Sequence, residues 1–229
     1  MKNAQIPPKD AIWQTSYVSY RRLWLDYCLE QSAPKMRGLV LDLGGKRENK
    51  RGTFRPPEGQ AQAWWYLNLE MSTRPNILGD VTQTPLASEC ANVIICTEVL
   101  EHLKDPAACA AEIFRLLRPG GQAFVSIPFM YPVHADPYDF QRFTDAGLQR
   151  MFDNFSTAEI IPMGGYLGVI GMFIELGLTG IKGQQIYKKV FRRLLTALAH
   201  WLYSRDLAAN QQPEAWTKFT TGYFIRAIK

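Results

Sequence analysis

Residues 129–144 concentrate side chains that can move a proton or hold a charged group. The segment reads FMYPVHADPYDFQRFT and contains one histidine, two aspartates, two tyrosines and one arginine. His134 is the candidate general base, because an imidazole titrates near working pH. Asp139 and Arg142 can orient that imidazole or bind a substrate, and they can equally form a structural ion pair that orders the segment.

A second set of candidate residues has the pattern E-x-x-E-H. Glu98, Glu101 and His102 would share one face of a helical turn. Together with His134 they supply two carboxylates and two imidazoles, which can hold a divalent ion. The sequence does not favour a metal over a metal-free site, so these four residues are an alternative assignment.

Small or acidic residues directly follow several short apolar runs. Asp42, Gly44 and Gly45 close the run LVLDL, and the later candidates are Glu70, Asp80, Thr97 and Glu98. A glycine after a strand lets a ligand approach the backbone closely. A carboxylate at the end of the second strand, Glu70, can accept two hydrogen bonds from a ribose diol. Asp80, at the end of the third, can receive an exocyclic amine.

The elements that must position these residues follow from apolar spacing and helix-boundary residues. Helices are predicted over Ala11–Gln31, from Asp105-Pro106 to Pro119-Gly120-Gly121, and from Thr144-Asp145; strands are predicted over 39–43, 64–70, 76–81, 92–96, 122–127, 157–161 and 220–228. Alternating strands and helices imply a mostly parallel sheet with helices on both faces. The predicted class is therefore α/β: a doubly wound, seven-stranded, Rossmann-like sheet with an N-terminal helix and a helical insertion before the last strand. Ligands of such sheets bind beyond the carboxyl ends of the strands, where the candidate residues fall.

Composition indicates a globular chain of one elaborated domain. The 229 residues are 47% hydrophobic and 21% charged, which excludes disordered and fibrous classes. The four cysteines form no C-x-x-C pair and are expected to be buried free thiols of a reducing compartment. Residues 1–15 contain no apolar run of the kind that a secretory signal needs, so a cytoplasmic location is expected.

The positive charge is concentrated in two segments. Residues 46–60 hold five bases and two acids, and residues 186–203 hold four bases and no acid. Local anionic partners such as phosphates or lipid headgroups fit these segments, and so does a plain solvated surface. A nucleic-acid partner is not favoured, and the oligomeric state stays open.

The segment 163–212 is the predicted helical insertion. Residues 163–181 are apolar and glycine-rich with one acid, Glu175, which favours a buried or interfacial segment over a membrane span. Residues 186–203 place apolar residues on one stripe and four bases opposite, as in a helix that lies on an anionic membrane. Packing over a substrate cleft or at a dimer interface is the alternative.

From about Gly38 to Phe155 the chain resembles the class I S-adenosylmethionine-dependent methyltransferases, specifically the methyltransferase type 11 domain group. The resemblance rests on LVLDLGG, YLNLE, ILGDVTQTPLASECANVIICTEVLEHLKDP and EIFRLLRPGGQAFVSIP, in the family order and spacing. It implies that Asp42, Gly44 and Gly45 line the methionine part of S-adenosyl-L-methionine. It further implies that Glu70 binds the ribose hydroxyls and that Asp80 and the backbone of Val81 bind the adenine. Thr97 and Glu98 would lie beside the methionine amine. The E-x-x-E-H residues together with His134 also look like the metal ligands of 2′-O-methyltransferases acting on small RNAs and of quinone-pathway O-methyltransferases. The Leu-Glu-His part of this motif, residues 100–102, is however common in family members that bind no metal.

The chain departs from the family pattern after its first glycine. The family reads acid-x-Gly-x-Gly-x-Gly, whereas Lys46 and Glu48 occupy the later positions here. Residues 46–63 contain no apolar period, so an irregular basic loop is predicted in place of a helix. Whether this loop keeps normal cofactor affinity is left open, and the loop can also contact a phosphate-bearing substrate.

The expected function is methyl transfer to a sugar or lipid-linked glycan hydroxyl, because many bacterial proteins with a similar loop after the fifth strand occur with surface-polysaccharide assembly. A non-catalytic or membrane-peripheral module with a degenerate cofactor site is the alternative. A nicotinamide-dependent oxidoreductase is disfavoured because G-x-G-x-x-G is absent. The expected division is a helical cap over 1–37, a cofactor-binding core over 38–162, the insertion over 163–212 and a closing strand over 213–229.

Overall fold

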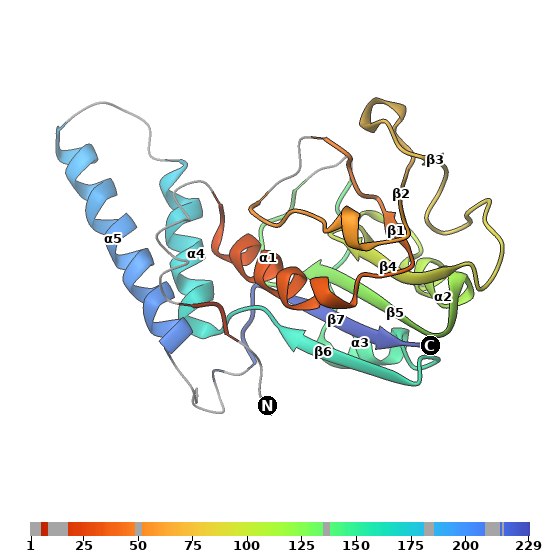
Figure 1. Ribbon diagram of the computed structural model, residues 1–229. Coiled ribbons are helices and arrows are strands. Elements are labelled where there is room, and N and C mark those ends of the chain that lie inside the picture. The colour runs from red at the N-terminus through yellow and green to blue at the C-terminus, as the bar shows by residue number, and fades with distance from the viewer. Residues whose placement is uncertain are drawn as a thin grey trace.

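A seven-stranded sheet forms the centre of the protein (Figure 1). The computed structural model describes residues 6–8, 18–48, 52–134, 138–180, 186–208, 216 and 218–229. The strands are β1 (Leu39–Leu43), β2 (Ala63–Asn68), β3 (Ile77–Leu78), β4 (Ala91–Thr97), β5 (Leu117–Pro128), β6 (Thr157–Pro162) and β7 (Gly222–Ile228), in the order β3-β2-β1-β4-β5-β7-β6. The pairs among the first five strands are parallel, and β7 runs antiparallel to both β5 and β6. The predicted doubly wound, mostly parallel sheet is confirmed.

Side chains that hydrogen-bond to backbone N–H groups begin three of the helices. The helices are α1 (Tyr20–Ser32), α2 (Pro106–Leu116), α3 (Asp145–Met151), α4 (Tyr166–Leu178) and α5 (Ile186–Ala208). The carboxylate of Asp105 accepts from the N–H of Ala108 at 3.0 Å, and the Thr144 hydroxyl accepts from the N–H of Gly147 at 3.2 Å. Both predicted helix starts are confirmed, because each cap satisfies an amide that the first turn leaves free.

The two faces of the sheet carry separate apolar cores. Successive side chains of β4 point to opposite faces, so Ile94 and Cys96 belong to one core and Val93 and Ile95 to the other. The first core contains apolar residues of α2 and α3, and the second contains those of α1 and α5. Burial on both faces explains why the central strands read as nearly continuous apolar runs.

Several predicted boundaries were wrong by a few residues. Residues 11–17 of the first predicted helix lie outside the described part, and α1 begins at Tyr20 because Ser19 is extended and caps the helix. Strand β2 ends at Asn68, since Glu70 opens a short 3₁₀ turn, and β3 is reduced to two residues. The Pro119-Gly120-Gly121 turn lies within β5, where backbone hydrogen bonds of 3.0 Å join Gly120 and Gly121 to Lys229.

The segment that follows β1 lacks the usual α-helix among its described residues. Between residues 46 and 62 the described part contains only a 3₁₀ turn at Glu58–Gln60. Thr53 fixes this segment to α1, because its backbone N–H and its hydroxyl both donate to Asp26 Oδ2, at 2.6 and 3.1 Å. The prediction of an irregular basic crossover agrees with the described residues.

Helices α4 and α5 form an antiparallel pair beside the sheet (Figure 1). The Tyr20 ring of α1 stacks on Tyr203 of α5 with centroids 4.2 Å apart, and the Tyr20 hydroxyl donates to buried Asp206 at 2.7 Å. The backbone N–H of Gly165 donates to the same carboxylate at 2.7 Å. This buried cluster attaches the pair to α1. Within the described residues, no helix combines the length and apolar character needed to cross a bilayer.

Candidate active site

One cavity of about 960 Å³ collects most of the predicted site residues. Its wall includes Asp42, Gly44, Gly45, Glu70, Thr97, Glu98, His102 and His134, together with Arg21, Lys46 and Tyr131. Most of these residues lie at or beyond the carboxyl ends of β1, β2, β4 and β5. The cavity therefore lies where a doubly wound sheet binds its ligand.

The turn after β1 requires glycine at two successive positions. Gly44 has φ +77°, and a Cβ there would lie 2.5 Å from a Val99 methyl group. A Cβ on Gly45 would lie 2.2 Å from the Asp42 carboxylate. Because neither contact is tolerable, both glycines leave backbone open to the cavity beside Asp42.

Asn68 holds this turn, and sequence reasoning missed it. Its side-chain amide donates to the carbonyls of Gly44 and Gly45 at 3.0 and 3.1 Å, and its Oδ1 accepts from the N–H of Glu70 at 2.9 Å. One side chain thus joins the glycine turn to the segment that carries Glu70. An amide at the last residue of the second strand, in YLNLE, is the signal that could have indicated this role.

Glu98 is held by partners on two other elements. It follows β4 with φ +58°, accepts a hydrogen bond from the Ser126 hydroxyl at 2.8 Å and forms an ion pair with Arg21 of α1. The Arg21 guanidinium also lies over the Tyr131 ring, 4.3 Å from its centroid. Arg21 was not identified from the sequence as a site residue, and Tyr131 was named only as part of the candidate segment 129–144.

The residues predicted for the adenine are not part of the cavity wall. Asp80 is exposed, and its Oδ1 accepts from the backbone N–H and the hydroxyl of Thr82 at 2.8 and 2.7 Å. Val81 is buried in the apolar core. Glu70 therefore lines the cavity, whereas Asp80 and Val81 do not. One Asp80 oxygen is used in a local turn, and the Val81 side chain packs in the core.

His134, Asp139 and Arg142 form a connected group. Arg142 binds both carboxylate oxygens of Asp139, one of them at 2.6 Å, and this pairing lowers the pKa of Asp139 to about 2. The Oδ2 of Asp139 accepts from the backbone N–H of His134 at 3.0 Å and lies 3.1 Å from its Nδ1. Partial burial lowers the pKa of the His134 imidazole, which favours the neutral ring. The Asp139–Arg142 ion pair, one of the two alternatives weighed from the sequence, is present, and the other alternative, orientation of the imidazole, stays a prediction.

Glu101 and His102 lie against the same loop. Three hydrogen bonds join the two segments: His102 Nδ1 to the Tyr138 carbonyl at 2.6 Å, Phe140 N–H to the Glu101 carbonyl at 2.8 Å, and Gln141 Nε2 to the Leu103 carbonyl at 2.8 Å. The Glu101 side chain is fully buried, and burial raises the pKa of its carboxyl group.

Three of the four residues of the alternative metal set come together. Glu101, His102 and His134 place donor atoms within 4.8 Å of one another, whereas Glu98 is absent from that group. Leu100–His102 form a 3₁₀ turn that begins after Glu98, so the E-x-x-E-H residues do not share a helical face. Glu98 instead pairs with Arg21 and Ser126.

Residues 63–125 match the family model described as the methyltransferase domain. A solved S-adenosylmethionine-dependent methyltransferase of Archaeoglobus fulgidus superposes with a TM-score of 0.54 at 14% identity, covering 91% of this chain and 94% of the other. This is a class I methyltransferase fold. The resemblance predicted from the sequence is confirmed by the domain match and the fold, and the similar proteins named here include S-adenosylmethionine-dependent methyltransferases.

Curated relatives match shorter parts of the chain. A probable S-adenosylmethionine-dependent methyltransferase of Mycolicibacterium smegmatis is 42% identical over 50 residues, which cover 22% of this chain and 20% of the relative. A ubiquinone/menaquinone biosynthesis C-methyltransferase of Dinoroseobacter shibae is 26% identical over 161 residues, covering 62% of this chain and 58% of the relative. The chain thus spans less than two thirds of either relative's length.

Proposed function

We propose that the protein is an S-adenosylmethionine-dependent methyltransferase that methylates a hydroxyl oxygen of a sugar or a lipid-linked glycan. The observation that carries the proposal is that one cavity is lined both by the strand-end residues Asp42, Gly44, Gly45 and Glu70 and by His134. A transferase needs its cofactor and its acceptor side by side, because alignment of the reacting atoms supplies much of the rate enhancement.

The residues around the glycine turn fit the cofactor. Gly44 and Gly45 leave backbone uncovered beside Asp42, where any side chain would collide. Asp42 and this backbone would hold the amino-acid part, and Glu70 would accept hydrogen bonds from the ribose hydroxyls. When bound, S-adenosylmethionine supplies an electrophilic methyl group. Thr97 and Glu98 would bind beside the methionine amine, with the orientation of Glu98 fixed by Arg21.

The other wall of the cavity fits a polar acceptor. Tyr131 lines this wall with an aromatic ring, and His134 lies 5.6 Å from that ring, centroid to centroid. Asp139 and Arg142 position His134, so we assign it to the activation of the acceptor hydroxyl, whose proton must leave during transfer. Among the described bases of the predicted basic loop, Lys46 reaches the cavity wall, where it can meet a phosphate of the acceptor.

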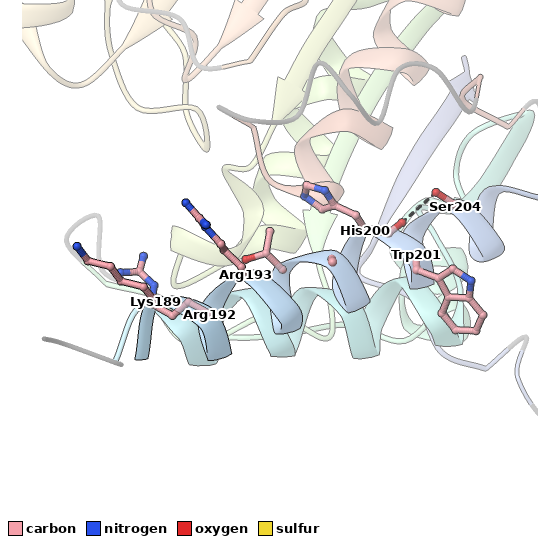
Figure 2. Close-up of a pocket in the computed structure, with 8 residues that line it drawn as sticks. Lys189, Arg192, Arg193, His200, Trp201 and Ser204 are labelled. Atoms are coloured by element: carbon pink, nitrogen blue, oxygen red, sulfur yellow. Dashed lines mark hydrogen bonds between the residues drawn. The ribbon is translucent and has the colours of Figure 1, made fainter. Parts of the chain in front are cut away.

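The outer face of α5 supports an acceptor at a membrane surface. Ile186, Tyr187, Val190, Phe191, Leu194, Leu198 and Trp201 recur at spacings of three and four and are 43% to 81% exposed. Lys189 and Arg193 point to one side of the helix and Trp201 to another (Figure 2). The exposed apolar stripe is about 22 Å long and lies beside basic residues. Helices that lie in an anionic membrane interface have this arrangement of side chains.

Calorimetric titration with S-adenosylmethionine and its demethylated product tests the cofactor assignment. Micromolar binding by the wild type and at least tenfold weaker binding by Glu70→Ala are expected, and Glu159→Ala serves as an exposed control. A panel of sugars and glycan lipids, assayed for the demethylated product, tests turnover. Absence of cofactor binding would overturn the proposal. Binding without turnover on any hydroxyl acceptor would favour the non-catalytic module.

A further inference from the structure

Three metal-ligating side chains converge at the wall of the cavity. The Nε2 atoms of His102 and His134 lie 3.7 and 3.9 Å from Glu101 Oε1. The two imidazoles meet edge to face with ring centroids 5.1 Å apart. The convergence joins a turn after β4 with the loop after β5, segments more than 30 residues apart in the chain.

Both imidazoles direct an unprotonated nitrogen toward Glu101. His102 Nδ1 lies 2.6 Å from the Tyr138 carbonyl oxygen, which can only accept, so Nδ1 carries the proton. His134 Nδ1 lies 3.1 Å from the Asp139 carboxylate without forming a hydrogen bond to it, so the negative charge alone favours a proton on Nδ1. With the proton on Nδ1, each neutral ring presents the lone pair of Nε2 to Glu101. Histidine ligands of metals are oriented in this way, by a carbonyl or carboxylate on the other nitrogen.

The Glu101 carboxylate has no hydrogen-bond donor on any other residue that the structure describes. Its side chain is fully buried. Arg21 and Arg142 supply compensating positive charge, but Arg21 forms its ion pair with Glu98 and Arg142 forms its own with Asp139. A buried carboxylate without a partner is costly, and here it faces two further lone pairs.

We propose that Glu101, His102 and His134 bind one divalent transition-metal ion. Two imidazole nitrogens and one carboxylate favour Zn²⁺, Mn²⁺, Fe²⁺ or Co²⁺ over Mg²⁺ or Ca²⁺, which prefer oxygen ligands. Ligands about 2.1 Å from a tetrahedral ion lie about 3.4 Å apart. The two distances to Glu101, 3.7 and 3.9 Å, exceed that by a few tenths of an ångström, and all three donor atoms lie within 4.8 Å of one another.

The ion would leave open coordination positions on the cavity side. His102 and His134 both line the cavity that contains Asp42 and Glu70. A hydroxyl bound to such an ion has a lowered pKa, and two neighbouring sugar oxygens can bind together. His134 then acts as a metal ligand, and the ion activates the acceptor. This inference deepens the proposed function and rests on it for the identity of the acceptor.

Direct metal titration tests the site without turnover. The full chain, stripped with a chelator, is titrated with Zn²⁺, Mn²⁺ and Mg²⁺ by calorimetry and with Co²⁺ by visible absorption. We expect one equivalent of Zn²⁺ or Co²⁺ at micromolar affinity or tighter, and no comparable Mg²⁺ binding. Glu101→Gln and His102→Gln should each weaken binding at least tenfold. His200→Gln, which changes the third histidine of the chain, should leave it unchanged.

Titration of each variant with S-adenosylmethionine separates loss of the metal site from misfolding. If Glu101→Gln or His102→Gln does not bind S-adenosylmethionine, Asp139→Glu is tested in its place. This change displaces the carboxylate next to His134 and should therefore alter the absorption spectrum of bound Co²⁺. The metal proposal fails if the wild type binds no stoichiometric metal, or if binding persists in both Glu101→Gln and His102→Gln. Methyl transfer by metal-free protein would overturn the catalytic role of the ion and leave the proposed function intact.

Discussion

A single oxygen of Asp139 accepts a hydrogen bond from the backbone of His134 and lies beside its ring. Oδ2 accepts from the His134 N–H at 3.0 Å and lies 3.1 Å from Nδ1, while Arg142 binds the same carboxylate from the other side. The loop at His134 is therefore held by a buried carboxylate that Arg142 immobilises, and the charge of that carboxylate faces the imidazole. Such a ring is prepared to act through Nε2, whether on a proton or on a metal ion.

Asp139→Asn should lower kcat by about 100-fold with little change in the affinity for S-adenosylmethionine. The amide keeps the shape of the side chain but no longer selects the Nδ1–H tautomer or neutralises Arg142. Steady-state kinetics and cofactor titration give the two numbers. Asp153→Asn, on an exposed residue, is the matched control. Turnover within twofold of wild type would show that Asp139 only orders the loop.

The free energy of unfolding should fall between about pH 4.5 and pH 2. Hydrogen bonds and ion pairing lower the pKa values of both Asp139 and Glu112 to about 2 in the folded protein. A group with a lowered folded pKa stabilises the fold above its unfolded pKa, near 4, and that stabilisation is lost as the pH falls toward 2. Denaturation by urea at a series of pH values measures the loss.

Glu112→Gln separates the contribution of one of these groups. Its carboxylate accepts from Arg115 at 2.7 Å and from the Thr84 backbone and hydroxyl at 2.8 and 2.6 Å. The change should lower the free energy of unfolding by about 2 kcal/mol at pH 7. It should also reduce the dependence of that free energy on pH in the acid range. Glu159→Gln, whose carboxylate is mostly exposed, should change stability by less than about 0.5 kcal/mol. Equal effects of the two changes would contradict the assignment.

Gly45→Ala should weaken the binding of S-adenosylmethionine at least tenfold. The added methyl group would collide with the Asp42 carboxylate and displace it from the cavity wall. Gly59→Ala is the control, because a Cβ at that position has no neighbour within 4 Å. Calorimetry on both variants checks the prediction. Unchanged affinity in Gly45→Ala would remove Asp42 from the cofactor site.

Phe191→Glu with Leu194→Glu should reduce binding to vesicles that contain anionic lipid at least tenfold. These side chains are 50% and 64% exposed on the outer stripe of α5. Leu78→Glu, on an equally exposed apolar residue of β3, should leave binding unchanged. Cosedimentation with neutral and anionic vesicles distinguishes the apolar and charge contributions. Binding that survives the double change would exclude α5 as the contact.

The order and kind of most elements could be predicted because their signals are local. The apolar runs at 39–43 and 92–96 and the caps Asp105 and Thr144 involve neighbours in sequence, and each is found in the structure. The glycines after β1 were likewise recognisable. Boundaries shifted where a tertiary partner intervened, as at Gly120 and Gly121, whose backbone pairs with the chain end.

The partners of the site side chains were decided only by packing. Glu98 pairs with Arg21 across 77 positions of sequence, which removes it from the predicted metal set, and Asn68 reaches back to the turn at Gly44. Asp80 bends into its own turn, whereas Glu101 meets His134 from a separate loop. Residue types and strand order fix which groups approach the edge of the sheet. Which of them touch depends on the loops that cross that edge, because contacts between distant segments leave no periodic signal in the sequence.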